Sequence, residues 1–401
     1  MTMKALSFLL LCILLCASSE TTAQDSYTWW DIEGLQFTEP VDCIRVSDTS
    51  FIVLSRTAET WPFPNTTYPI VSSYTIDGRL LWQVELEQAS FSVNPQGIVP
   101  APDNGWKILG TEYLSPGNTS TVRIHLDALG NYQGLHVLSS DTVPSIRQTI
   151  PLDNNWYAIS SPHTGRPRIV VFSEDDQLQW QHEFEVPDPT IFYDMRKAND
   201  GVIAAGRAMP IDTNQNAYTV LTKLSVSGEE EWTKAYHSPL NEFNLGVLPL
   251  HDGTFITYGF QRKHRTVFTD QRIAVTRVNW HGDSLSSFYM DAASPFHMIQ
   301  RRGGEILMSG HDQSFLPWIG HVTFGELPGA DRIEAPETFA PVKLLEINDS
   351  TVVMLERRYT LTASQTSLSD LDTRVYVLKR QNVLSVQEHG NERKARIMDL
   401  R

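Results

Sequence analysis

A turn-and-strand unit recurs seven times along this chain, about every 50 residues. Each unit begins with a polar turn followed by a short apolar strand, such as DNGWKILG at 103–110 and HDGTFITYG at 251–259. The residues that end these turns are Ser50, Gly105, Asn155, Gly201, Gly253, Gly304 and Ser350, spaced 46 to 55 apart. Self-similarity at this period indicates one repeat architecture rather than two or three unrelated domains.

A second element follows the first in every unit. It is a β-branched or aromatic strand, a tight turn and another strand, as in VSSYTIDGRLLWQVEL at 71–86. The turn residues are Gly78, Gly130, Asp176, Gly228, Gly282, Gly329 and Asn382. Residues that tolerate a positive φ suit the two-residue hairpin turns whose twist matches the flanking strands, so we expect such turns here. No segment keeps a 3.6-residue period, which indicates strands throughout.

Each unit also holds a strand upstream of its polar turn, such as NPQGIVPAP at 94–102, which makes four strands per unit. Seven four-stranded units predict an all-β fold, a seven-bladed β-propeller of antiparallel blades. A β-solenoid usually has a shorter coil, and a pair of sandwiches would not repeat seven times. We expect the propeller to span residues 24–390, followed by a charged tail at 391–401.

Closure of the ring has two candidate segments. YTWWDIEGLQF at 27–37 precedes the first unit and could supply the outer strand of the last blade. NVLSVQ at 382–387, inside the last unit, competes for the same place. We favour the N-terminal segment, lying on or near blade seven.

The N-terminus has the pattern of a cleavable signal peptide at 1–23. Lys4 precedes a run of 13 apolar or small residues, and a polar stretch then ends in Ala23. A membrane anchor is a weaker reading because this run is too short to span a bilayer. Lipidation is also weaker, because Leu rather than a small residue precedes both Cys12 and Cys16. We expect a secreted or extracellular protein, with the periplasm or cell surface as alternatives.

Removal of this segment leaves Cys43 as the one cysteine, so no intrachain disulfide can form and the core must hold the fold. We interpret Cys43 as a small buried hydrophobe rather than a nucleophile. The net charge of −15 disfavours nucleic acid, because the field of the protein repels phosphate. No later apolar stretch approaches the length of a membrane span. We expect a monomer whose partner is an extracellular protein or glycan.

Three units end their hairpin with a tryptophan: DGRLLW at 77–82, DDQLQW at 175–180 and SGEEEW at 227–232. The segment KLSVSGEEEW at 223–232 resembles the repeat of secreted bacterial propellers of the pyrroloquinoline-quinone-like and delta-60 types. The resemblance covers nearly the whole mature chain and implies that Trp82, Trp180 and Trp232 dock between blades. The other units depart from the pattern, with Gly134, Ser286, Ile333 and Val386 in this position.

Motifs for catalysis are absent from the sequence. It contains no HExxH, no paired CxxC, no GxSxG, no P-loop and no GxGxxG. Quinone-dependent dehydrogenases are disfavoured because the mature chain lacks vicinal cysteines, and sialidase boxes do not match in spacing. We therefore expect no cofactor, no metal and no catalytic residue.

The connections between the second and third strand of a unit, the B-to-C loops, are long at 58–69, 208–218, 261–271 and 359–373. Binding residues concentrate on loops held by a rigid scaffold, so the face that carries them is the candidate surface. Two groups on it are candidate binding residues: the aromatic Trp61, Phe63 and Tyr68, and the basic Arg262, Lys263, His264 and Arg265. The first could stack on a sugar and the second could pair with an anion. Loops that cover the ring or are merely solvated are the alternatives for both.

These observations favour a secreted, non-catalytic binding or interaction module that uses the B-to-C face. The alternative is an extracellular carbohydrate-active hydrolase or lyase with its site at the mouth of the channel. Two carboxylates about 5 to 9.5 Å apart in a pocket would favour glycosidase chemistry.

Overall fold

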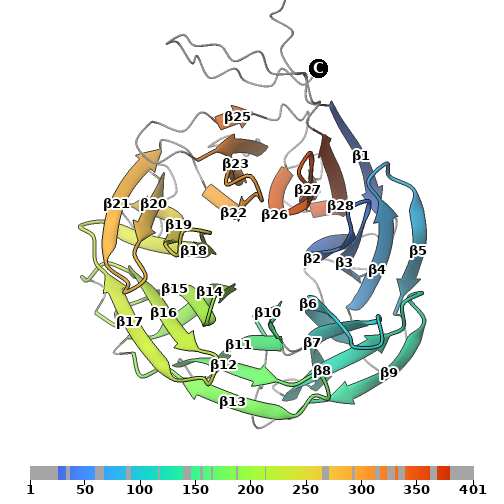
Figure 1. The fold of residues 1–401 in the computed structure, drawn as a ribbon, viewed down its shortest axis with the longest axis horizontal. Helices are drawn as coiled ribbons and strands as arrows, with labels where there is room; N and C mark the ends of the chain where they lie inside the picture. The colour runs from blue at the N-terminus through green and yellow to red at the C-terminus, as the bar shows by residue number, and fades with distance from the viewer. Residues whose placement is uncertain are drawn as a thin grey trace, which may run out of the picture.

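Seven blades of antiparallel strands surround a central channel in the computed structural model (Figure 1). The structure describes residues 26–32, 37–58, 67–86, 92–115, 118–138, 146–153, 157–163, 166–186, 188–212, 214–263, 271–290, 294–311, 317–322, 330–332, 339–361 and 368–379. The predicted turn residues Gly329 and Asn382 and the segment 382–387 lie outside these ranges. Within them, no helix is long and apolar enough to cross a bilayer.

The strands of a blade follow one another from the channel outward, and we name them A to D in that order. Blade 1 contains β2 (Phe37–Ser47), β3 (Ser50–Ala58), β4 (Tyr68–Thr75) and β5 (Leu80–Glu85). Blade 2 contains β6 (Val93–Pro100), β7 (Trp106–Ser115), β8 (Asn118–Leu126) and β9 (Tyr132–Val137). Blade 3 contains β10 (Gln148–Pro151), β11 (Tyr157–His163), β12 (Arg166–Phe172) and β13 (Leu178–Glu183). Blade 4 contains β14 (Thr190–Ala198), β15 (Gly201–Ala208), β16 (Tyr218–Ser225) and β17 (Glu230–Tyr236).

The second half of the ring repeats this order until the last blade. Blade 5 contains β18 (Asn241–Pro249), β19 (Phe255–Arg262), β20 (Arg272–Val278) and β21 (Ser284–Met290). Blade 6 contains β22 (Ser294–Gln300), β23 (Ile306–His311), β24 (Pro317–His321) and β25 (Ala330–Arg332). Blade 7 contains β26 (Phe339–Asn348), β27 (Thr351–Leu361) and β28 (Leu368–Lys379), and its fourth strand is β1 (Ser26–Ile32). Four-stranded blades thus follow from the repeat, as predicted.

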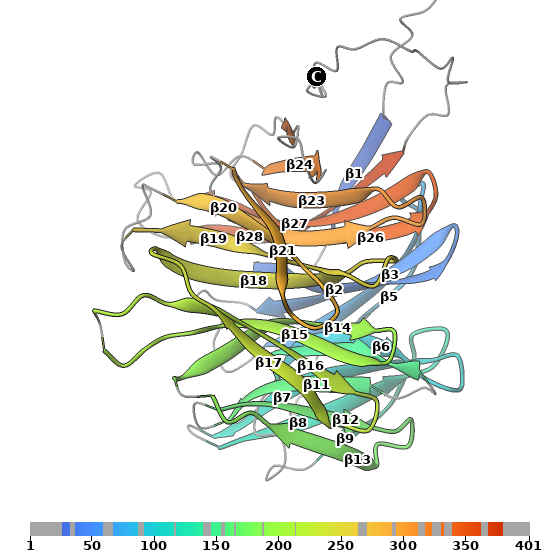
Figure 2. The ribbon, with the colours of Figure 1, turned by 60° about the vertical axis from the view of Figure 1, so that its left-hand side comes forward.

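The N-terminal segment closes the ring, as we expected. Strand β1 lies antiparallel to β28 over its whole length, from Ser26 opposite Lys379 to Ile32 opposite Thr373 (Figure 2). The Nε of Arg374 on β28 donates a hydrogen bond to Asp31 Oδ1 at 2.6 Å. The two ends of the chain therefore share one blade.

The C-to-D turns use residues in the left-handed region, as predicted, but the turns are longer than predicted. Positive φ values occur at Gly78, Gly130, Asp176, Gly228 and Gly282. In blade 1 the Gly78 N–H donates to the Thr75 carbonyl, and the Thr75 N–H donates to the Arg79 carbonyl, each at 3.0 Å. This is a type I turn closed by a left-handed residue, and it shifts the register between Ser73 and Tyr74. The prediction of two-residue turns was wrong because both turn classes select residues that tolerate a positive φ.

The apolar core lies between the blades rather than in one central mass. Seven clusters of buried apolar side chains occur among the described residues, and each joins two neighbouring blades. In the cluster between blades 7 and 1, Phe51 and Val377 are fully buried and Cys43 is 3% exposed. Burial also raises the pKa of the Cys43 thiol far above its usual range. Cys43 is therefore a packed core residue, as predicted.

Tryptophans of outer strands pack on the hairpin turn of the following blade. A Cβ atom placed on Gly130 would lie 2.5 Å from the Trp82 ring, and one on Gly228 would lie 2.5 Å from the Trp180 ring. Only glycine allows this approach together with a positive φ. The Trp180 Nε1 also donates to the Val226 carbonyl at 2.9 Å. These contacts confirm the docking that the resemblance implied.

The same arrangement occurs at two further interfaces. Trp232 packs against Gly282, and its ring centroid lies 6.4 Å from that of Phe255. At the closing interface Trp30 of β1 packs against Gly78 of blade 1. The sequence pattern assigned this position in the last blade to Val386, which lies outside the described residues. Trp30 was missed because it stands before the first unit of the repeat.

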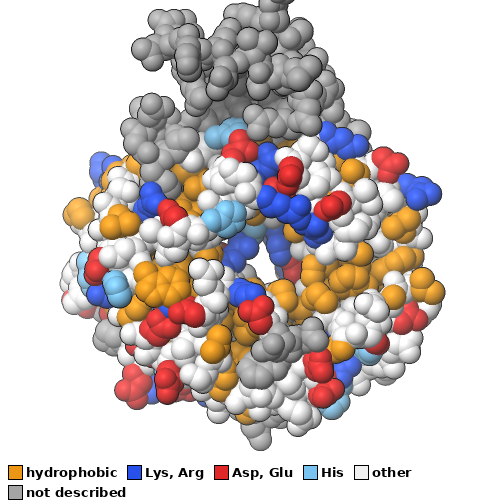
Figure 3. Space-filling view, viewed as in Figure 1, with side chains coloured by type: hydrophobic (Ala, Val, Ile, Leu, Met, Phe, Trp, Pro, Cys, Tyr) orange, Lys and Arg blue, Asp and Glu red, His pale blue; other side chains and the backbone are white. Residues whose placement is uncertain are grey.

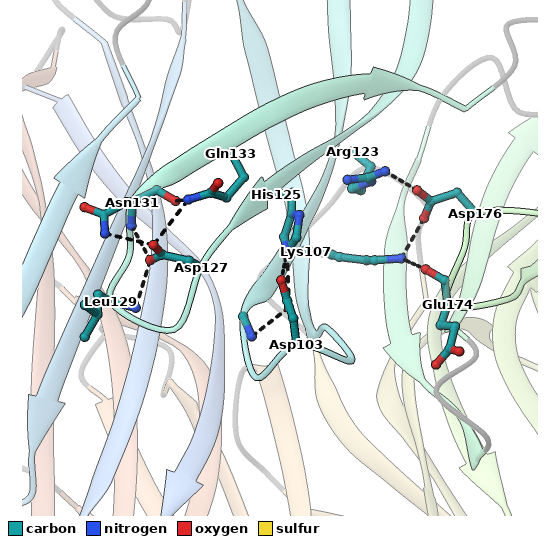
Figure 4. Close-up of polar contacts among 11 residues, drawn as sticks. Asp103, Lys107, Arg123, His125, Asp127, Leu129, Asn131, Gln133, Glu174 and Asp176 are labelled. Atoms are coloured by element: carbon teal, nitrogen blue, oxygen red, sulfur yellow. Dashed lines mark hydrogen bonds and ion pairs between the residues drawn. The ribbon is translucent and has the colours of Figure 1, made fainter.

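Blade 2 has no tryptophan to dock, and an ion cluster joins it to blade 3 instead. Gly134 occupies the tryptophan position, and the turn of blade 3 carries Asp176 where blades 1, 2, 4 and 5 have glycine. The Asp176 carboxylate contacts Lys107 Nζ at 2.8 Å and the Arg123 guanidinium (Figure 4). It also accepts a hydrogen bond of 2.9 Å from the Tyr157 hydroxyl. A charge pair thus replaces the aromatic contact at this interface.

Candidate functional site

The central channel is a large cavity. It encloses about 750 Å³, and side chains from the inner strands of all seven blades line it. In the space-filling view along the channel, Lys and Arg side chains surround the opening although the chain as a whole is acidic (Figure 3). The lining therefore differs in charge from the rest of the protein.

A register shift occurs in strand A of six of the seven blades, and the residues that follow it are Asp42, Gly97, Asp194, Gly246, His297 and Lys343. The four of these that carry a side chain, Asp42, Asp194, His297 and Lys343, line the channel. A β-bulge re-aims a side chain in this way and is frequent next to functional sites. The bulge thus sets which residues face the channel.

Three of these residues hold the neighbouring blade through its backbone. Asp42 Oδ2 accepts the Ile98 N–H at 3.0 Å, and Asp194 Oδ2 accepts the Val247 N–H at 3.0 Å. In the same way His297 Nδ1 accepts a hydrogen bond of 3.2 Å from the Leu344 N–H. A buried acceptor that satisfies a buried N–H stabilises the ring. The primary role of these side chains is therefore to join blades.

Every described carboxylate that lines the channel contacts a cation. The pairs are Glu39 with Arg56 and Arg357, Asp42 with Lys343, Asp194 with Arg196 at 3.1 Å, and Glu346 with Arg301 at 3.5 Å. All four carboxylates are thus held in the ion pairs of the channel wall.

His297 and Arg196 meet in the wall of the channel. The Arg196 Nη2 lies 2.5 Å from His297 Nε2. Burial, and secondarily the charge of Arg196, lowers the pKa of His297 well below its usual range, so the imidazole is neutral. Tyr258 lines the same wall. No group of three or more His, Cys, Asp or Glu side chains that could hold a metal occurs in the described part of the chain.

A row of alternating arginines and aromatic rings lies at the B-to-C end of the channel. Arg147 Cζ lies 4.6 Å and Arg207 Cζ 5.3 Å from the Tyr193 ring centroid. Arg207 Cζ also lies 4.8 Å from the Phe243 ring, over which Arg262 Cζ lies at 4.1 Å. Each contact is a cation–π arrangement. We call these five residues the arginine–aromatic row.

The position of the row follows from the strand order. Arg147 directly precedes strand A of blade 3, and Arg207 is the last residue but one of strand B of blade 4. Strand A starts and strand B ends at the face that carries the B-to-C loops. The row therefore lies on the face that the sequence indicated, but most of it comes from strands rather than loops.

The structure separates the residues that the sequence grouped as candidates. Of the aromatic group, Trp61 and Phe63 lie outside the described residues, and Tyr68 is the half-buried first residue of β4. Of the basic group, Arg262 is buried at the end of β19, Lys263 is exposed, and His264 and Arg265 lie outside the described residues. Arg262 is thus part of the arginine–aromatic row, and a binding role stays a prediction for all seven residues.

Arg147, Tyr193 and Arg207 were missed in the sequence because no motif links them. One signal was present: Arg56 and Arg207 stand at the same place in their units, near the end of strand B. An alignment of the repeat units would have shown that an arginine recurs at this position of strand B.

The fold and this channel define the chain as a seven-bladed β-propeller with a charged central cavity. No family model and no curated protein matches the sequence. The chain is similar to the polysaccharide lyase Uly1, with a TM-score of 0.55 and 9% identity over 91% of this chain and 94% of that one. It is similar to a protein of unknown function from Dyadobacter fermentans, with a TM-score of 0.53 and 8% identity over 90% of this chain and all of that one. It is also similar to Drosophila Plexin A in complex with Semaphorin 1b, with a TM-score of 0.52 and 7% identity over 90% and 88%. These likenesses show the fold alone.

Proposed function

We propose that this protein is a secreted, monomeric binding module that holds an extracellular ligand at the B-to-C end of its channel, without catalysis of its own. One observation carries the proposal: a cavity of about 750 Å³ whose lining comes from all seven blades. Side chains held on a closed ring of strands are pre-organised, which lowers the cost of ordering them on binding. The signal-peptide pattern at 1–23 supports an extracellular partner, a glycan or a protein.

A glycan and protein array tests the proposal with a variant that fills the channel. Gln96 is half-buried in the channel lining, so Gln96→Trp should obstruct the cavity. Leu129→Trp adds the same side chain at an exposed turn on the opposite face and is the matched control. We expect array ligands to be lost with Gln96→Trp and kept with Leu129→Trp. Ligands that bind Gln96→Trp unchanged would contradict a channel site.

The aromatic loop predicted from the sequence is tested on the same array with Trp61→Ala. Loss of ligands in this variant would support a contribution of the loop to binding. Unchanged binding would refute it while leaving the channel proposal intact.

A lyase is the second candidate, favoured by the grouping of Arg196, His297 and Tyr258 in one wall. Removal of a proton beside a uronate carboxylate needs a cation for the carboxylate and a neutral base such as imidazole. His297 is poorly suited to this role because Nδ1 already accepts a backbone N–H and Nε2 faces Arg196. We expect no rise in the ultraviolet absorbance of unsaturated uronate when the protein is incubated with pectate or alginate. A rise that His297→Ala abolishes would replace the binding proposal by the lyase.

A further inference from the structure

Arg147 and Arg207 are cations without an acidic partner in an acidic protein. Among the described residues, no carboxylate lies within ion-pair distance of either guanidinium. The Nε of Arg207 is buried and has no hydrogen-bond partner. A buried donor left unpaired is costly, so each such group requires an explanation. A ligand that brings an acceptor to this place supplies one.

The sequence explains why Arg207 is unpaired. Arg56 stands at the same place in blade 1, opposite Glu39 on strand A, and that carboxylate neutralises it. In blade 4 the residue opposite Arg207 is Ile191, which has no charge to offer. The arginine at this position is thus paired with a carboxylate in blade 1, whereas blade 4 has no carboxylate opposite it.

Tyr193 contacts both guanidiniums, although Arg207 is not itself among the residues that line the cavity. Arg147 is exposed and Tyr193 is half-buried, and both line the cavity. Stacking on the ring orients a guanidinium but leaves its N–H groups available in the plane. A guanidinium oriented in this way suits an oxyanion, which accepts two parallel hydrogen bonds from its fork.

Two polar side chains that could hydrogen-bond to hydroxyl groups follow Arg147 in the sequence. Gln148 donates its amide N–H to Asp194 Oδ1 at 2.7 Å, and its buried Oε1 has no partner. The Thr149 Oγ1 is also buried without a partner. A Cβ on Gly97 would lie 2.9 Å from the Thr149 Cβ and 3.3 Å from this hydroxyl, so blade 2 packs closely on Thr149. Both side chains line the cavity.

We infer that Arg147 and Arg207, oriented by Tyr193, bind carboxylate or sulfate groups of an acidic saccharide whose hydroxyls reach Gln148 and Thr149. A saccharide brings hydroxyl donors together with its anionic groups. The inference rests on the proposed channel site and names its ligand class.

Titration calorimetry with oligogalacturonate and with a sulfated galactan oligosaccharide tests the inference. Fully methyl-esterified oligogalacturonate is the matched neutral probe. We expect at least one acidic probe to bind, with affinity that falls at higher salt, and the ester to bind at least ten-fold more weakly. Arg147→Gln and Arg207→Gln should each weaken binding by roughly 10- to 100-fold, as expected for a lost charge-assisted hydrogen bond.

Arg79→Gln is the matched control, because Arg79 is exposed in a C-to-D turn on the opposite face, and it should bind like the wild type. Thermal unfolding of each variant shows whether it folds, and Arg207→Lys keeps the charge if Arg207→Gln does not. Absence of binding by both acidic probes, or equal affinity in the Arg147→Gln and Arg207→Gln variants, overturns the inference. If array ligands are neutral and sensitive to Gln96→Trp, the ligand class is wrong and the channel site stands. If no ligand responds to Gln96→Trp, the channel site itself is wrong.

Discussion

Replacement of Asp176 by Asn should destabilise the ring far more than loss of an ordinary surface ion pair. The Asp176 side chain is 4% exposed and Lys107 is 5% exposed, so both charges are removed from water. Asn has nearly the same shape and tolerates the φ of 62° at this turn, so the change removes charge rather than conformation. It leaves the buried Lys107 and the half-buried Arg123 without this counter-charge, which costs about 3 to 5 kcal/mol.

Asp283→Asn is the matched control in the corresponding turn of blade 5. Asp283 is 62% exposed, and its carboxylate lies 3.4 Å from the Nζ of Lys234, which is 43% exposed. Loss of such a pair costs about 1 kcal/mol or less. Urea unfolding followed by tryptophan fluorescence at pH 7 measures both variants.

The pH dependence supplies an independent check on Asp176. Burial opposes ionisation, but the hydrogen bond and charge of Lys107, with the charge of Arg123, hold the pKa of Asp176 below its usual value. A lowered carboxyl pKa stabilises the fold above the unfolded-state pKa, and this contribution is lost as the pH falls through the folded-state pKa. The gap between wild type and Asp176→Asn should therefore narrow below about pH 4. An Asp176→Asn variant as stable as Asp283→Asn at pH 7 would refute the reasoning.

Three further predictions concern burial, turn geometry and closure. Burial raises the pKa of Glu356 to about 8, and a nearby arginine and tyrosine lower it by less. The folded protein therefore loses stability as the pH rises from the unfolded-state pKa of this carboxyl group through 8. Glu356→Gln should be about 3 kcal/mol more stable than wild type at pH 7 and nearly equal near pH 4, and a gap independent of pH in urea unfolding would contradict this. Gly130→Ala should lower the free energy of unfolding by about 2 to 4 kcal/mol, because alanine is strained at a positive φ and its Cβ clashes with the Trp82 indole. Gly253→Ala has the same strain but open space around the Cβ, so it should cost about 1 kcal/mol. Equal losses of stability in thermal unfolding would rule out the clash. Deletion of 24–32 should expose the closing interface and lower the unfolding midpoint strongly, whereas deletion of 391–401 should leave it unchanged; equal midpoints would mean that β1 does not close the ring.

The sequence by itself determined the features that depend on neighbouring residues. The number of blades, the strands and the left-handed turn residues all follow from patterns a few residues long that repeat seven times. The docking of Trp82 and Trp180 was also predicted from the sequence, because each tryptophan ends a six-residue motif, DGRLLW or DDQLQW. Even here the sequence left the turn length open, since one residue preference serves two turn types.

Tertiary structure alone decided which distant segments meet. Two segments competed for the last strand, and only the pairing of β1 with β28 distinguished them. The arginine–aromatic row draws its residues from three blades, so no local motif marks it. The surroundings of a charged side chain also depend on distant segments. Arg262 belongs to a basic run in the sequence, but the fold buries it against Phe243 of the neighbouring strand. Burial and pairing depend on the whole ring, because the innermost strands of separate units become neighbours only when it closes.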